Sequence, residues 1–289
     1  MNNNNISVYS IYSSETKEIY KKSSEYLSNY YNKYDINTVF IHKDQDRRVK
    51  IAIENLINSG LSEWWSIVVS RFLLLQSFLE SDADYFVLQD LDNIVINKDL
   101  NIRNELTSSW VCPWWDYGNI NNPDSFFYRD VGTIRKFHNQ SYVISKHKNI
   151  TLYNQPHHHV CADFIGVSRQ VAVKIIKFYQ DIGCDTSNPD KFCDFIMEVV
   201  KNTEAFTNID AGIQEEELFA AYITASEDTP QNINQTNIRH DTCDINNENW
   251  SGGVINLIAQ IKKRDKIFVH LGRCDKLNFF PSVVEQFKC

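Results

Sequence analysis

Short apolar runs and longer amphipathic stretches alternate along this chain, and the spacing of apolar residues predicts the type of each element. Runs rich in β-branched and aromatic residues predict strands. Apolar residues that recur every three or four positions predict helices packed by one face. The expected strands are residues 6–12, 37–42, 85–88, 94–96 and 266–270. The expected helices are residues 15–31, 47–57, 62–79, 169–181, 191–201 and 254–261, and a further helix within residues 210–225 that glutamates 215–217 open.

The order of these elements predicts the fold class. Strands and helices alternate over residues 6–88, which is typical of an α/β fold with a mostly parallel central sheet flanked by helices. A chain of 289 residues, 43% of them hydrophobic, is sufficient for one large domain of this kind. With only 9 Gly and 6 Pro, long flexible linkers are not expected. We therefore expect residues 1–289 to form a single domain, with ligands at the carboxyl ends of its strands.

Two carboxylates, Asp90 and Asp92, follow the apolar run at residues 85–88. In an extended chain both side chains point to the same side, because side chains repeat every second residue. Neighbouring carboxylates repel each other unless a proton or a cation lies between them, and a hard divalent cation with oxygen ligands would satisfy both. A polar turn that ends the strand is the other interpretation. From this stretch alone, a metal site and a turn both remain open.

Net charge, cysteine content and the lack of targeting segments limit the partners and the cellular compartment that the sequence predicts. The net charge of −8 argues against an electrostatic grip on nucleic acid or on an anionic membrane. The 7 cysteines include no CxxC pair, so free thiols are expected rather than a disulfide framework or a structural zinc site. The N-terminus lacks the basic and apolar regions of a signal peptide, and no apolar run has the length of a membrane span. These features predict a cytoplasmic protein.

Three charged or histidine-rich features lie beside predicted elements. Arg71 lies at the margin of the apolar stripe of residues 62–79, where it would either extend to solvent or point at a phosphate. Glutamates at 215, 216 and 217 open the helix within residues 210–225, where the helix dipole favours acidic residues. Residues 157–159 are three consecutive histidines. Neighbouring side chains point apart in an extended chain, so at most one could bind a given metal, and a polar wall is the expected role.

An aromatic cluster occupies residues 110–117. Core packing is one explanation for its tryptophans. The alternative is a sugar-binding platform made by Trp114, Trp115 and Asp116 in or near a loop, because exposed rings beside a carboxylate can hold the apolar face and the hydroxyls of a sugar. Residues 119–147 are polar and poorly periodic, which is typical of an insertion or a lid over a cleft.

The segment SRFLLLQSFLESDADYFVLQDLD, residues 70–92, resembles the nucleotide-diphosphate-sugar glycosyltransferases of the GT-A fold. It combines an amphipathic helix with a strand that ends in Asp-x-Asp. The resemblance implies a GT-A (Rossmann-like) sheet, with a nucleotide-sugar-binding half at about residues 1–100 and an acceptor-side half at about residues 101–289. It also implies that Asp90 and Asp92 hold Mn²⁺ or Mg²⁺, which bridges the donor diphosphate. The Lys-Pro-Trp ending of one such family is absent, so no individual family is assigned.

The C-terminal segment His270-Leu271-Gly272-Arg273 is also similar to metal-dependent GT-A enzymes, and this similarity implies further donor contacts. His270 would be the third metal ligand, with basic residues at the diphosphate. Strand-end residues would contact the base and ribose, and Tyr12 would stack on the base. The implied donor-binding residues are Ser10, Tyr12, Asp44, Arg71, Asp90, Gly272, Arg273 and Lys276.

Two segments carry the implied catalytic carboxylates. Residues 160–168, VCADFIGVS, resemble the acceptor-side strand of GT-A enzymes, with Asp163 facing the donor sugar and Gly166 letting the sugar approach the backbone. GT-A enzymes often place another carboxylate at the start of the following helix, a position that Glu216 fits best, then Glu215 and Glu217. Such a carboxylate would either deprotonate the acceptor, with inversion, or stabilise an oxocarbenium-like centre, with retention. Both remain open.

Taken together, these features predict a hexosyltransferase-type glycosyltransferase that uses a UDP- or GDP-sugar, a glycan-type hydroxyl acceptor and Mn²⁺ or Mg²⁺. One alternative is a nucleotidyltransferase on a related fold, although residues 13–16 lack the Gly-rich basic loop expected of it. The other is a non-catalytic carbohydrate-binding protein.

Overall fold

The computed structural model describes residues 5–116, 131–147, 158–207, 212–226, 228–233, 236–241, 259, 266–271 and 285. Its strands are β1 (Ile6–Tyr12), β2 (Asn37–His42), β3 (Tyr85–Gln89), β4 (Asn93–Val95), β5 (Trp110–Cys112), β6 (Trp114–Asp116), β7 (His158–Val160), β8 (Phe164–Ser168), β9 (Gln231–Asn232), β10 (Arg239–Asp241) and β11 (Phe268–His270). Its helices are α1 (Ser14–Lys33), α2 (Arg47–Asn58), α3 (Glu63–Ser70), the 3₁₀ turn η1 (Arg71–Leu73), α4 (Leu74–Leu79), α5 (Ile102–Glu105), α6 (Val131–Lys146), α7 (Arg169–Asp181), α8 (Pro189–Thr207) and α9 (Glu215–Ser226).

A six-stranded sheet in the order β2-β1-β3-β8-β5-β9 forms the centre of the molecule. Strand β8 runs antiparallel to both of its neighbours, β3 and β5, whereas the other pairings are parallel. The predicted mostly parallel α/β sheet is therefore confirmed. A small sheet, β10-β11-β4, and a two-stranded sheet, β6-β7, complete the described strands.

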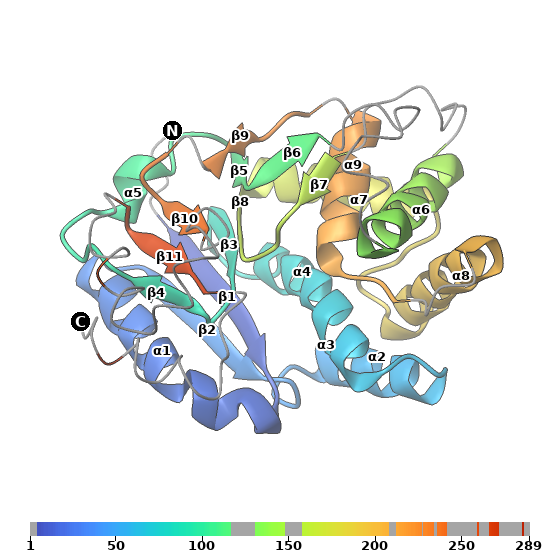
Figure 1. Cartoon of the computed structure of the whole chain (residues 1–289), viewed down its shortest axis with the longest axis horizontal. Coiled ribbons are helices and arrows are strands. Elements are labelled where there is room, and N and C mark those ends of the chain that lie inside the picture. The colour runs from blue at the N-terminus through green and yellow to red at the C-terminus, as the bar shows by residue number, and fades with distance from the viewer. Residues whose placement is uncertain are drawn as a thin grey trace.

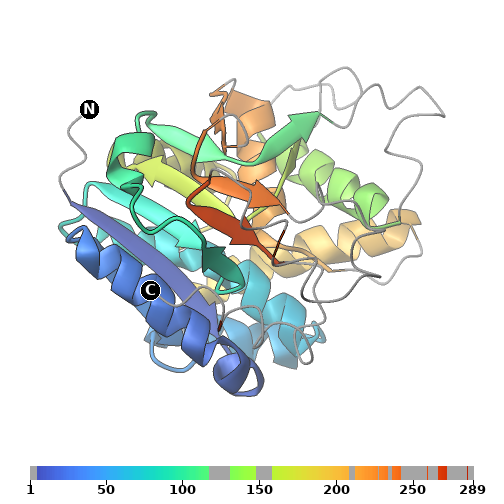
Figure 2. The same ribbon diagram turned by 60° about the vertical axis from the view of Figure 1, so that its left-hand side comes forward.

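Side chains of the central strands alternate between two cores, as expected for strands covered on both faces. Ile6, Val8 and Val87 pack toward α1 and β11, whereas Phe86 and Leu88 pack toward the helices of the other face. Figure 1 shows α1 on one side of the sheet, with α2 to α4 and α6 to α9 gathered on the other. The view in Figure 2 shows α1 running along its face of the sheet.

The helix expected at residues 62–79 is interrupted. Helix α3 ends at Ser70, a 3₁₀ turn covers Arg71–Leu73, and α4 continues from Leu74. The expectation of one continuous helix is therefore wrong in detail. The polar stretch expected to be a lid also contains a regular helix, α6, which its weak apolar period did not reveal.

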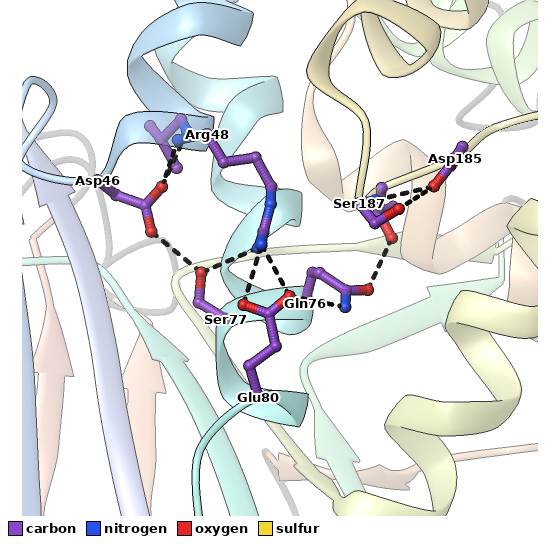
Figure 3. A network of polar contacts seen from close by, with 9 residues as sticks. Asp46, Arg48, Gln76, Ser77, Glu80, Asp185 and Ser187 are labelled. Atoms are coloured by element: carbon purple, nitrogen blue, oxygen red, sulfur yellow. Dashed lines mark hydrogen bonds and ion pairs between the residues drawn. The ribbon is translucent and has the colours of Figure 1, made fainter.

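A polar network joins the start of α2 to the end of α4 (Figure 3). Asp46 caps α2 by accepting hydrogen bonds from the backbone of residues 48 and 49, and Ser77 donates to the same carboxylate at 3.1 Å. Arg48 donates to both carboxylate oxygens of Glu80, at 2.7 and 2.9 Å. These contacts hold α4, and with it the 3₁₀ turn at Arg71, in a fixed position relative to α2.

Within the described residues, no helix combines the length and apolar character needed to cross a membrane.

Candidate functional site

A cavity of 420 Å³ opens at the carboxyl ends of β1 and β3, where ligands of parallel sheets bind. It lies between the sheet and residues from α3, α6, α9, β7 and β11. Its described lining includes Ser10, Tyr12, Tyr20, Trp64, Arg71, Asp90, Asp92, Lys136, His159, Cys161, Asp163, Gln214, Glu215, Glu216 and His270. Among these described residues five are carboxylates, whereas Arg71 and Lys136 are the permanent cations, so carboxylates outnumber cations in the described lining.

The turn that carries Asp90 and Asp92 is held from three directions. The backbone N–H of Asp90 donates to the carbonyl of Asp163 at 2.9 Å. The hydroxyl of Ser23, on α1, donates to the carbonyl of Leu91, which is itself buried. Asp92 accepts the backbone N–H of Leu271 through its carbonyl at 3.1 Å. The segment therefore forms a turn that carries both carboxylates, so the turn interpretation is confirmed and the metal site stays a prediction.

His270 reaches this turn through the pairing of β11 with β4. The two strands are antiparallel, and His270 lies opposite Asn93, the residue after Asp92. Its Nε2 is 3.5 Å from an oxygen of Asp92. One ligand atom from each of Asp90, Asp92 and His270 lies within 4.8 Å of the others, so the three predicted metal ligands converge on one point.

Electrostatics at Asp90 favour a bound cation. Burial raises the pKa of Asp90, and the neighbouring carboxylates of Asp92 and Asp163 raise it further, against the guanidinium of Arg71. A divalent cation between Asp90 and Asp92 would remove the repulsion. The two carboxylates suit Mn²⁺ or Mg²⁺, and an imidazole is the more usual ligand of Mn²⁺ of these two. The residues present therefore fit the metal that the sequence resemblance implied.

Arg71 is buried, so the expectation that it extends to solvent is wrong. Its guanidinium forms ion pairs with Asp90 and, at 2.9 Å, with Glu215. A further bond runs from Nη2 to the carbonyl of Ala162 at 3.3 Å. The break in the helix at residues 71–73 places this side chain at the cavity wall. Arg71 thus links the Asp90 turn to the start of α9.

The three consecutive glutamates have three different environments. Glu215 forms an ion pair with Arg71. Burial nevertheless raises the pKa of Glu215 to about 8, and the nearby charge of Asp90, which shares the same guanidinium, also raises it. Burial would also raise the pKa of Glu216, but Lys136 and His159 hold it below its ordinary value. Glu217 does not line the cavity. Its carboxylate is 3.6 Å from Arg135 and accepts a hydrogen bond from Asn139, and burial raises its pKa to about 7.

Several lining residues were not identified from the sequence. Lys136 lies on α6, in the polar segment whose helix the apolar period did not predict. Trp64 is 55% exposed and lies against Trp65 with ring centroids 4.4 Å apart. Among the three histidines at 157–159, His159 lines the cavity, as expected of a polar wall. An adjacent Arg-Lys pair in a polar stretch and an exposed Trp-Trp pair were the available signals for 135–136 and 64–65.

Other predicted site residues lie elsewhere. Asp44 is not among the described lining residues, and its carboxylate is 3.1 Å from Nδ1 of His42. Trp114 packs against the core and donates its indole N–H to the carbonyl of Pro230 at 3.0 Å, outside the cavity. The side chains of Trp115 and Asp116 lie outside the described part of the chain, as do residues Gly272, Arg273 and Lys276.

Gly166 has a packing role. A Cβ atom at this position would lie 2.9 Å from Cε1 of Tyr85 and 2.9 Å from Cγ2 of Val111, on the strands that flank β8. The missing side chain therefore makes room for neighbours within the sheet. The expectation that Gly166 lets a sugar approach the backbone is not needed to explain this residue, and Gly166 does not line the cavity.

Among the comparisons with known proteins, only the comparison of structures found similar proteins. No protein-family model matches the sequence, and no curated protein is significantly similar to it. A glycosyltransferase involved in the glycosylation of the major capsid of PBCV-1 is 10% identical, with a TM-score of 0.47 over 96% of this chain and 98% of that chain. The galactosyltransferase LgtC, in complex with donor and acceptor sugar analogues, is 8% identical, with a TM-score of 0.42 over 98% and 96%. Statements about function therefore rest on the residues of this chain.

Proposed function

We propose that this protein is a metal-dependent glycosyltransferase that moves a sugar from a UDP- or GDP-sugar to a hydroxyl acceptor. The observation that carries the proposal is the convergence of Asp90 and Asp92 with His270, which lies far away in sequence, at the carboxyl ends of parallel strands. A bound Mn²⁺ or Mg²⁺ would act as a Lewis acid that offsets charge on the departing nucleoside diphosphate.

The residues of β1 suit the nucleoside part of the donor. Ser10 and Tyr12 are at the end of this strand and line the cavity. The ring of Tyr12 lies at a steep angle to His42, with centroids 5.6 Å apart, and in the proposed complex it stacks on the base. Arg71 neutralises part of the carboxylate charge beside the diphosphate position and fixes the Asp90 turn.

Glu216 is the carboxylate that best suits the sugar side of the cavity. It is buried in the wall and paired with Lys136, which holds its pKa low, so it is an anion at neutral pH. A carboxylate with a low pKa is a weak base but an effective partner for a developing positive charge. In the proposed reaction Glu216 stabilises the oxocarbenium-like centre, and Asp163 lies on the neighbouring wall. Trp64, half exposed at the cavity, offers a ring face to the acceptor.

One feature of the structure favours sugar transfer over the alternative, nucleotidyl transfer. That class needs a phosphate-binding loop between β1 and the first helix. Helix α1 begins at Ser14, two residues after β1 ends at Tyr12, so the chain has no room for such a loop there.

Calorimetric titration with UDP and GDP, with and without Mn²⁺, tests the proposal. We expect binding that depends on Mn²⁺, and at least tenfold weaker binding by Asp92→Asn, which removes one ligand charge and keeps the side-chain size. Asp99→Asn is the matched control, because Asp99 is 84% exposed and pairs with Lys33 on the surface. If the wild-type protein binds neither nucleotide in a metal-dependent way, the proposed function fails. A donor and acceptor screen read by mass spectrometry then identifies the sugar and the acceptor.

A further inference from the structure

A second set of metal-ligating side chains lies in the same cavity, on the other side of His270. The thiol of Cys161, the carboxylate of Asp163 and the imidazole of His270 offer ligand atoms that lie within 4.8 Å of one another. Nδ1 of His270 is 3.6 Å from Asp163, whereas Nε2 is 3.5 Å from Asp92. The two ring nitrogens therefore face two different carboxylates, and each belongs to a different cluster of three ligands.

The backbone fixes all three positions. The N–H of Cys161 donates to the carbonyl of Pro113 at 3.1 Å, and the carbonyl of Asp163 accepts the N–H of Asp90 at 2.9 Å. His270 is held by the pairing of β11 with β4. Asp163 and His270 are buried, while Cys161 is partly exposed and lines the cavity. An ion in solution thus has a path to a rigid set of donors.

The donor set differs in kind from that of the Asp90–Asp92 cluster. Thiolate and imidazole ligands favour borderline-soft ions such as Zn²⁺, whereas carboxylate-rich sites suit Mg²⁺ and Mn²⁺. Zinc bonds of about 2.0–2.3 Å place tetrahedral ligand atoms about 3.5 Å apart, so small side-chain rotations would bring these three into range. Three protein ligands also leave a fourth position open to water from the cavity.

We propose that Cys161, Asp163 and His270 form a second cation site, selective for Zn²⁺ and similar ions, which shares His270 with the Asp90–Asp92 site. Binding releases the thiol proton to solvent. A neutral imidazole has one nitrogen free to bind an ion, so an ion at this site uses His270 in place of an ion at the Asp90–Asp92 site, not together with it. This site goes beyond the proposed sugar transfer and does not depend on it.

Titration of the full-length protein with Co²⁺ tests the site, because Co²⁺ replaces Zn²⁺ and gives a near-ultraviolet charge-transfer band only when a thiolate coordinates it. We expect this band in the wild-type protein and in Asp90→Asn, which leaves all three proposed ligands in place. Cys161→Ser should abolish the band and weaken Zn²⁺ binding at least tenfold. Cys193→Ser is the matched control, since Cys193 lies on α8 beside Ser59 and should leave the band intact.

Absence of the band from the wild-type protein would overturn the proposal, and so would a band that persists in Cys161→Ser or disappears in Cys193→Ser. Asp163→Asn provides a second variant of nearly unchanged volume, and an unaltered Zn²⁺ affinity in that variant would also contradict the site. No nucleotide or sugar is present in these titrations, so their outcome is separate from that of the nucleotide-binding test.

Discussion

The ion pair between Lys136 and Glu216 joins two elements that meet only in the folded chain. Lys136 comes from α6 and Glu216 from the first turn of α9. Both side chains are largely shielded from water, and the ammonium is what keeps the pKa of Glu216 low against burial. Removing one partner of such a pair leaves an uncompensated buried charge, which is costly.

Lys136→Met should therefore raise the pKa of Glu216 and protonate it at a higher pH than in the wild-type protein. If Glu216 acts as an anion, we expect kcat to fall at least tenfold near neutral pH. The acidic limb of the pH–rate profile should move to higher pH. Lys136→Arg should retain most of the activity and the wild-type profile. Lys174→Met, which removes a surface pair with Asp228, is the control. An unshifted profile in Lys136→Met would assign this pair a purely structural role.

At the scale of elements, β8 contributes both to the central sheet and to the cavity. It pairs antiparallel with β3 and β5, and the turn that precedes it carries Asp163. Gly166 lies where the three strands meet, under the ring of Tyr85. The sheet tolerates no side chain there without displacement of its neighbours.

Gly166→Ala should destabilise the protein by about 1–3 kcal/mol, because the added methyl group overpacks a closed core. Chemical denaturation followed by circular dichroism measures the change. Tyr85→Leu in the Gly166→Ala background should recover part of the loss, since it removes the ring atoms that a Cβ would meet. Equal stability of Gly166→Ala and wild type would show that the space beside Gly166 is not closed, and would reopen a role in ligand approach.

At the scale of the whole molecule, folding buries several carboxyl groups, and burying them in the ionised form reduces the free energy of unfolding. Glu217 is an example outside the cavity. Burial raises its pKa to about 7 in the folded protein, against about 4.3 in an unfolded chain. A pKa that folding raises means that the stabilising effect of the proton is fully present below about pH 4.3 and is lost as pH rises through about 7.

Glu217→Gln removes this titration and keeps the size and the polar contacts of the side chain. Relative to the variant, the wild-type protein should lose on the order of 3 kcal/mol of unfolding free energy between pH 4 and pH 8, most of it below pH 7. Denaturant unfolding at several pH values measures the difference. Glu198→Gln is the control, because hydrogen bonds from Lys146 and Tyr142 lower the pKa of Glu198. Its difference should change little between pH 5 and pH 8 and should have the opposite sign as the pH falls below about 4.3. A difference that does not vary with pH would refute a raised pKa for Glu217.

The local pattern of residues determined most of the elements of this fold. Strand β1 and strand β2 have the bounds that their β-branched and aromatic runs predicted, and α7 begins and ends as its apolar period indicated. Asp90 and Asp92 were identifiable as candidates because two carboxylates directly after an apolar strand repel each other unless a proton or a cation lies between them, although this stretch alone left a turn open as well. Such features depend on neighbours within a few residues, so the sequence alone carries them.

Only the tertiary structure decided which distant groups meet. His270 reaches Asp92 because β11 pairs with β4, and Lys136 reaches Glu216 because α6 packs beside α9. The tertiary structure also gives three adjacent glutamates different partners. Successive positions on a helix point in different directions, so each side chain meets a different cation. Periodicity reports which face of an element is buried, but the pairing of charges depends on the packing of elements far apart in the chain.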